Sequence, residues 1–415
     1  MKQSLHSTTL DNGITIVGER LPELESVAVA FHAPVGAIHD PPGKCGLATV
    51  TGEMCLRGAG TRDSRRLVED LESAGVQWAQ GVSSTHISVS GAMVARQLPE
   101  VLPIYADILR RPLLPAEELP AARQMVLQNL AGIEDEPAHR TIAALRRLQS
   151  PAPWGMPTEG ISADVTSIEI DDVRGFVARH LQPAGMIVSV AGRIEWDDFV
   201  RRVEALLGDW RAAPPPAVPT GVRGPTALHV PHDSQQTHIA VGWSVPPYRD
   251  DASHEATAAL AVLGGGPSSR FFTEVRERRA LCYTVSAGYQ TSRDFAHAVC
   301  YSGTSADRAQ ETLDVMLAEI ARLPGTITRD EVDRVKARAK SGLIMQQESS
   351  AARAGAIARQ WYHLASLRTL ADELDRYDRL DLAAIEGWLA AHPPRDVTVV
   401  SLGRDPLEVR HALSA

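Results

Sequence analysis

Hydrophobic and polar residues alternate with a period of two in several short segments of the chain. Residues 14–19 (ITIVGE) and 27–33 (VAVAFHA) follow this pattern in the first half, and residues 237–245 (THIAVGWSV) and 297–303 (HAVCYSG) have the corresponding character in the second. Side chains alternate between the two faces of a β-strand, so these segments are predicted to be strands.

Longer segments with a helical period separate the strands. Residues 64–75 (SRRLVEDLESAG) end in a glycine, a common stop signal for helices. Residues 309–323 (AQETLDVMLAEIARL) place Leu313, Leu317 and Ile320 on one helical face. Strand pairs interrupted by long helices predict an α+β fold, and they resemble neither a strict β-α-β alternation nor an all-β sandwich.

Each half of the chain ends with the same two patterns, a helical segment followed by an apolar strand. Residues 173–180 (VRGFVARH) lead into the apolar run 186–192 (MIVSVAG), and residues 385–392 (IEGWLAAH) lead into 397–403 (VTVVSLG). The matching residues are Val173 and Ile385, Gly175 and Gly387, Phe176 and Trp388, Ala178 and Ala390, His180 and His392, and Gly192 and Gly403. The repetition predicts an internal duplication; the alternative is a chance similarity between two helix–strand units.

A proline-rich segment lies near the middle of the chain. Residues 211–225 (RAAPPPAVPTGVRGP) contain five prolines and two glycines, a composition that disfavours helix and sheet and favours an extended spacer. The predicted organisation is therefore an N-terminal half at residues 1–211, a linker at 212–225 and a C-terminal half at 226–415.

Composition and charge narrow the range of partners. The 415 residues are 44% hydrophobic and 22% charged, with a net charge of −9 and no basic run. Nucleic acid and anionic membranes are therefore not expected as partners. No apolar stretch approaches the ~18 residues that span a bilayer, and the N-terminus lacks the apolar core of a signal peptide. A cytoplasmic location is expected, or a periplasmic one if a signal peptide was removed.

Generic catalytic signatures are few. The glycine-rich residues 263–271 (LGGGPSSRF) lack the features of a phosphate-binding loop and are predicted to form a tight turn. Three ordered segments nevertheless resemble the pitrilysin/insulinase-type zinc metallopeptidases, including the mitochondrial processing peptidase subunits. They are residues 10–17 (LDNGITIV), 35–67 (VGAIHDPPGKCGLATVTGEMCLRGAGTRDSRRL) and 264–289 (GGGPSSRFFTEVRERRALCYTVSAGY). The resemblance implies two homologous halves, each a mainly antiparallel sheet flanked by helices (a duplicated α/β roll), which face each other across a cavity.

The same resemblance identifies the positions of a zinc site. Active members carry His-x-x-Glu-His and a distant glutamate, in which the histidines and the distant glutamate bind zinc and the intervening glutamate is the general base. These four roles fall on Thr49, Gly52, Glu53 and Asn129. Only Glu53 could serve as a strong ligand, so no metal is expected in this chain and independent peptidase activity is not expected.

The second half carries a different family feature. Active members use an arginine and a tyrosine, seven residues apart, to bind the scissile carbonyl and its developing oxyanion. Arg276 and Tyr283 have this spacing. An arginine supplies a permanent cation and a tyrosine a neutral donor, which suits a charge that grows in the transition state. A surface ion pair of Arg276 and a half-buried Tyr283 are the purely structural alternative.

Together these features favour a non-catalytic subunit of a heteromeric zinc peptidase. Arg276 and Tyr283 would then assist a homologous catalytic partner, which would hold the zinc and cleave the peptide substrate. One alternative is a structural or assembly core subunit without a role in proteolysis. Another is a homodimer that binds peptides without cleaving them.

Overall fold

The computed structural model describes residues 3–213, 218 and 221–409. Within the proposed linker at 212–225, positions 214–217, 219 and 220 lie outside the described residues. The chain divides into two compact units, each built around its own sheet, and each unit draws on more than one stretch of sequence. Unit 1 comprises Met1–Gly132, Met156–Thr220 and Met345–Thr369, and unit 2 comprises Ile133–Gly155, Gly221–Ile344 and Leu370–Ala415.

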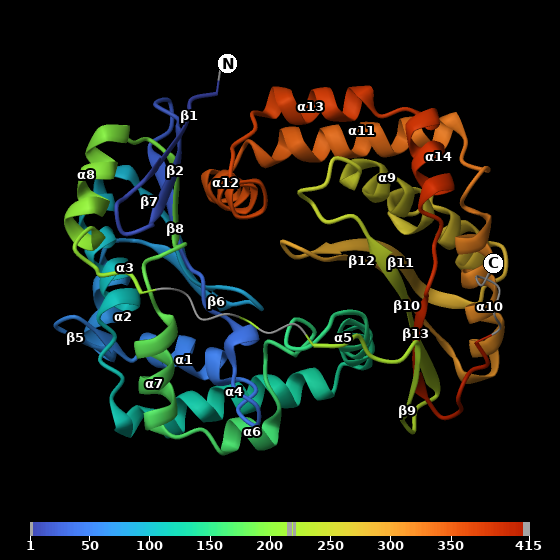
Figure 1. Ribbon diagram of the computed structural model, residues 1–415, viewed down its shortest axis with the longest axis horizontal. Coiled ribbons are helices and arrows are strands. Elements are labelled where there is room, and N and C mark those ends of the chain that lie inside the picture. Colours follow the sequence, from blue (N-terminus) through green and yellow to red (C-terminus); the bar gives the residue numbers. More distant parts are fainter. Residues whose placement is uncertain (1–2, 214–217, 219–220, 410–415) are drawn as a thin grey trace. The chain divides into compact units, whose positions relative to one another are not determined.

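A six-stranded sheet forms the centre of unit 1 (Figure 1). The strand order is β1-β2-β8-β3-β7-β6, and only the β2–β8 pair is parallel. The alternating segments predicted as strands in the first half are strands β2 and β3. The bounds are β1 (Leu5–Thr9), β2 (Thr15–Arg20), β3 (Ser26–Ala33), β6 (Gln77–Val82), β7 (Ile87–Val94) and β8 (Ile187–Gly192).

Helices of unit 1 pack their apolar faces on one side of this sheet. Helix α2, for example, is capped at its N-terminus by Asp63 and buries Leu67 and Leu71 in the core. The helices are α1 (Leu47–Cys55), α2 (Ser64–Ser73), α3 (Leu98–Arg110), α4 (Leu119–Glu134), α6 (Ser162–Thr166), α7 (Ile170–His180) and α8 (Trp196–Leu207). A two-stranded ribbon of β4 (Gly58–Ala59) and β5 (Arg62–Asp63) follows α1.

Unit 2 contains a five-stranded sheet with the order β11-β12-β10-β13-β9, in which only β13 and β9 are parallel. Its strands are β9 (Ala227–Pro231), β10 (Gln236–Val245), β11 (Cys282–Thr291), β12 (Ala296–Ser305) and β13 (Thr398–Gly403). Its helices include α9 (Ser253–Gly264), α10 (Ala309–Arg322), α11 (Arg329–Gln346), α13 (Leu370–Arg379), α14 (Leu382–Ala391) and the short π-helix η4 (Phe272–Glu277).

The two sheets have the same topology. The order β2-β8-β3-β7-β6 in unit 1 matches β9-β13-β10-β12-β11 in unit 2, including the position of the single parallel pair. The repeated helix–strand pattern is α7 with β8 in one half and α14 with β13 in the other. The expected α+β class, with duplicated and mainly antiparallel sheets flanked by helices, is therefore confirmed.

Each unit is completed by one helix from the other half of the sequence. Helix α12 (Ser350–Leu364) belongs to unit 1, where Ile357 and Ala358 pack against Val17 and Ile187. Helix α5 (Pro137–Gln149) belongs to unit 2, where Leu145 and Leu148 pack against Ala240, Val299 and Val400. These strand residues alternate with residues of the main cores, so each exchanged helix covers the opposite face of its sheet.

No helix in the described part of the chain is both long enough and apolar enough to cross a membrane.

Candidate functional site

Helix α1 carries three of the four positions that correspond to the zinc site. The helix begins after Gly46, whose φ of 106° lies in the left-handed region that favours glycine. The carboxylate of Asp40 accepts hydrogen bonds from the backbone N–H groups of Gly46 (2.7 Å) and Ala48 (2.8 Å) at this end of the helix. Burial raises the pKa of Asp40 to about 7, although these backbone donors oppose the rise. Thr49, Gly52 and Glu53 therefore lie on a helix with a fixed start.

Thr49 and Gly52, at the first two of these positions, are in contact with neighbouring segments of unit 1. The hydroxyl of Thr49 donates a 2.5 Å hydrogen bond to the carbonyl of Thr158. A Cβ atom added at Gly52 would lie 2.7 Å from Cγ2 of Val82 and would also meet the amide nitrogen of Gln80. Strand β6 therefore fills the space that a side chain at position 52 would need.

The other two positions are a partly buried carboxylate, Glu53, and an exposed amide, Asn129. Burial raises the pKa of the Glu53 carboxyl, and the nearby cation of Arg57 opposes the rise. Arg57 extends from the end of α1 to α4, where it contacts the sulfur of Met125 at 2.9 Å. Asn129 follows Met125 by one turn of α4 and is exposed.

These four residues do not fit a zinc ion. A threonine, a glycine and an asparagine accompany a single carboxylate, whereas zinc sites in proteins are built from several imidazole, thiolate or carboxylate ligands. In the described part of the chain, no group of three or more His, Cys, Asp or Glu side chains could hold a metal ion. The arrangement supplies no base at position 52, and no hydrolytic step can be derived from it.

Arg276 lies in unit 2 on the π-helix η4. The helix is widened by an i→i−5 hydrogen bond, in which the N–H of Arg278 donates to the carbonyl of Thr273 at 2.9 Å. The guanidinium carbon of Arg276 lies 4.6 Å from the ring centroid of Phe272 and 5.0 Å from that of Tyr283. Both distances are within the range of cation–π attraction. Single π-turns are rare and are found frequently at functional sites.

Tyr283 lies at an irregular point of strand β11. Cys282 pairs with Thr304 and Thr284 pairs with the adjacent Gly303, so Tyr283 is the extra residue of a β-bulge. Bulges re-aim side chains, and they are over-represented next to active sites. The Tyr283 side chain is 81% exposed. The structure thus brings Arg276 and Tyr283 together and leaves the phenol ring accessible to solvent.

Arg276 differs from the arginines that follow it in having no carboxylate partner among the described residues. Glu274 forms ion pairs with Arg278 (2.6 Å) and Arg279 (2.8 Å), and these partners hold the pKa of the Glu274 carboxyl below its usual range. Within residues 3–213, 218 and 221–409, no carboxylate forms an ion pair with Arg276. The surface ion pair considered as an alternative for Arg276 is absent from these residues, and Tyr283 is exposed rather than half-buried.

The arrangement of Arg276 and Tyr283 can bind a carbonyl oxygen that gains negative charge. The guanidinium provides several N–H donors and a permanent charge, and the phenol provides one O–H donor. The π-helix and the bulge that position them were not predicted from the sequence. Neither the π-helix nor the bulge can be recognised from the amino acids of its segment, because both depend on how the hydrogen bonds of neighbouring segments are paired.

Comparisons with known proteins identify the family. A family model described as "Insulinase (Peptidase family M16)" matches residues 15–157, and a second, "Peptidase M16 inactive domain", matches residues 167–339. Together they cover most of the chain, which belongs to peptidase family M16, the insulinase family. The resemblance recognised in the sequence is therefore confirmed.

Individual relatives agree over nearly the full length. An "uncharacterized zinc protease" of Rickettsia felis is 24% identical over 364 residues, which cover 87% of this chain and 88% of the relative. The "uncharacterized zinc protease YmxG" of Bacillus subtilis is 25% identical over 391 residues, covering 91% and 93%. A crystal structure of a "peptidase M16 inactive domain" from Pseudomonas fluorescens has a TM-score of 0.89 at 18% identity, covering 98% of this chain and 99% of the other. The structural similarity supports the fold.

Proposed function

We propose that this chain is a non-catalytic subunit of a heteromeric zinc peptidase. It would supply Arg276 and Tyr283 to a homologous partner that carries the complete zinc motif. One observation carries the proposal: Arg276 has no carboxylate partner among the described residues and lies against an exposed tyrosine at a bulge. The need for a partner that holds the zinc follows from the chemistry of Thr49, Gly52, Glu53 and Asn129, which do not fit a zinc site.

The two residues have different roles in the proposed reaction. The guanidinium of Arg276 binds the oxygen of the scissile carbonyl and supplies a permanent positive charge, as arginines in proteins do. The hydroxyl of Tyr283 donates a hydrogen bond that strengthens as the oxygen becomes negative. Such a donor contributes mainly in the transition state, so its removal lowers kcat more than it raises KM.

Mutation of the pair within the assembled peptidase tests the proposal. The chain is combined with a homologue that carries His-x-x-Glu-His, and peptide cleavage is measured for wild type, Arg276→Ala and Tyr283→Phe. Tyr283→Phe keeps the ring that contacts Arg276 and removes only the hydroxyl. We expect kcat to fall roughly 10²–10³-fold, the typical effect of losing one oxyanion donor.

Arg278→Ala is the matched control, since Arg278 lies on the same segment and is neutralised by Glu274. It is expected to leave kcat within about twofold of wild type, as surface ion pairs contribute little. Wild-type rates for both Arg276→Ala and Tyr283→Phe in the assembled complex would refute the proposal. Failure of the chain to stimulate any such homologue would instead favour a structural subunit or a non-cleaving homodimer.

A further inference from the structure

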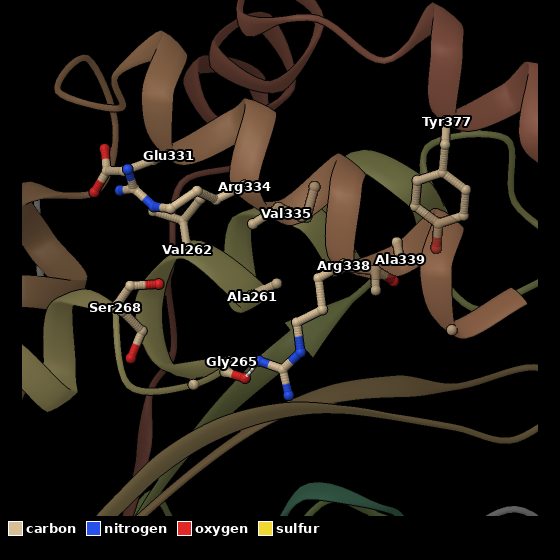
Figure 2. A pocket seen from close by; sticks show the side chains of 15 residues that line it. Ala261, Val262, Gly265, Ser268, Glu331, Arg334, Val335, Arg338, Ala339 and Tyr377 are labelled. Carbon is tan, nitrogen blue, oxygen red and sulfur yellow. Dashed lines mark hydrogen bonds between the residues drawn. The ribbon is translucent and has the colours of Figure 1, made fainter. Parts of the chain in front are cut away.

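A separate cavity of about 290 Å³ lies wholly within unit 2. Helix α9 and the glycine-rich turn that follows it form one wall, and helix α11 forms the other, as Figure 2 shows. Small apolar side chains line much of the surface, and Tyr377 of α13 lies at one end. The apolar residues include Ala261, Val262, Val335 and Ala339. The volume is just below the roughly 300 Å³ at which ligand pockets begin, so the cavity suits the end of a chain or a small ligand.

Two arginines on α11 give this cavity its charge. Arg334 and Arg338 are one helical turn apart, both line the cavity, and neither forms an ion pair within the described residues. Like charges at this spacing destabilise a helix. By contrast, Lys340 on the same helix pairs with Asp378 at 2.7 Å.

The polar groups near Arg334 and Arg338 do not neutralise the positive charge of these two arginines. The Arg338 guanidinium donates to the carbonyl of Gly265 at the end of α9, and a Cβ on Gly266 would meet this guanidinium. The lining carboxylate of Glu331 forms a bidentate ion pair with Arg270, at 2.8 and 3.0 Å. Ser268 stands across the cavity from α11 (Figure 2).

We propose that this cavity binds the C-terminal residue of a peptide, with its carboxylate at Arg338, whose guanidinium lies beside the glycine-rich turn (Figure 2), and its apolar side chain against α9 and α11. Arginine donors match a carboxylate in geometry and charge. The small lining residues leave room for an aliphatic side chain. The choice of a peptide rests on the proposed function, whereas the binding of a carboxylate rests on the charge and shape of the cavity alone.

Calorimetric titration of the full-length chain, without a catalytic partner, tests the proposal. The probe is N-acetyl-alanyl-alanyl-leucine as the free acid, compared with the same peptide as its C-terminal amide and with octanoate. We expect the amide to bind roughly ten- to hundredfold more weakly, because it loses charge-assisted hydrogen bonds. Equal binding of acid and amide, or no binding of the acid, would overturn the proposal. Octanoate binding as tight as that of the acid would overturn the assignment to a peptide.

Variants locate the bound carboxylate. Arg338→Ala is expected to weaken binding of the acid roughly tenfold or more, and circular dichroism verifies that the variant is folded. Arg329→Ala is the matched control, since Arg329 lies on the same helix, is exposed and is not among the cavity-lining residues. Arg276→Ala should leave this binding unchanged. If Arg276→Ala abolishes binding and Arg338→Ala does not, the peptide binds at Arg276 and this proposal fails while the proposed function stands.

Discussion

Replacement of Arg353 should weaken the attachment of the exchanged helix α12 to the sheet of unit 1 and so lower the stability of the protein. Arg353 donates two hydrogen bonds to Glu19 on β2, at 2.9 Å from Nε and 2.7 Å from Nη2. The side chains are only 12% and 2% exposed, respectively. Removing one partner leaves a buried charge without its counterion, and the cost of breaking such a pair is about 3–5 kcal/mol. We therefore expect Arg353→Met to lower the free energy of unfolding by about 3 kcal/mol or more.

A double-mutant cycle in urea unfolding, followed by circular dichroism, measures the contribution of this ion pair to stability. The double variant Glu19→Leu, Arg353→Met removes both charges and should recover most of the loss, since replacement of a buried pair by apolar residues is often neutral. The control is Arg20→Met, which removes an exposed ion pair with Glu195 (2.9 Å) from the next residue of β2 and should cost about 1 kcal/mol or less. A loss below about 1 kcal/mol for Arg353→Met, or a double variant less stable than Arg353→Met, would refute the account.

Three further predictions concern single residues. Gly52→Ala should lower the free energy of unfolding by about 1–3 kcal/mol, because the Cβ of the new alanine would overlap the side chain of Gln80. Adding the substitution Gln80→Ala should reduce this loss in the same urea assay. Ala280 adopts a φ of 50°, so Ala280→Gly should raise the free energy of unfolding by up to about 1 kcal/mol; a lower thermal midpoint would contradict this. Burial lowers the pKa of His86 to about 3, so its neutral form is retained in the fold and stability falls as pH drops below the unfolded value near 6.5. Between pH 7 and pH 5 this effect should lower the free energy of unfolding of the wild type by roughly 2 kcal/mol. His86→Gln should not show this part of the decrease, and equal decreases in both proteins would exclude the effect.

The sequence predicted the parts of the fold that depend on local pattern. Period-two alternation located β2 and β3, and the repeated helix–strand pattern located α7 with β8 and α14 with β13. The exchange of α5 and α12 could not be predicted in this way. An apolar stripe shows that a helix face is buried, but Ile357 and Leu145 carry no information about which sheet will cover them.

The sequence named the residues of the candidate site but did not predict their geometry. Resemblance to a family located Arg276 and Tyr283 by spacing, whereas their contact arises from a π-turn and a bulge. Ala280, between them in sequence, adopts positive φ without the glycine or asparagine that would signal it. Such features are set by tertiary packing and override local propensity.

Unpaired arginines connect the two proposals for unit 2. The chain has 51 acidic and 42 basic residues, so carboxylates are abundant enough to neutralise most cations. Glu274 pairs with Arg278 and Arg279, yet Arg276 nearby has no ion pair within the described residues. An arginine without an ion pair can bind an anionic oxygen of another molecule, and we propose this role both for Arg276 on η4 and for Arg338 on α11.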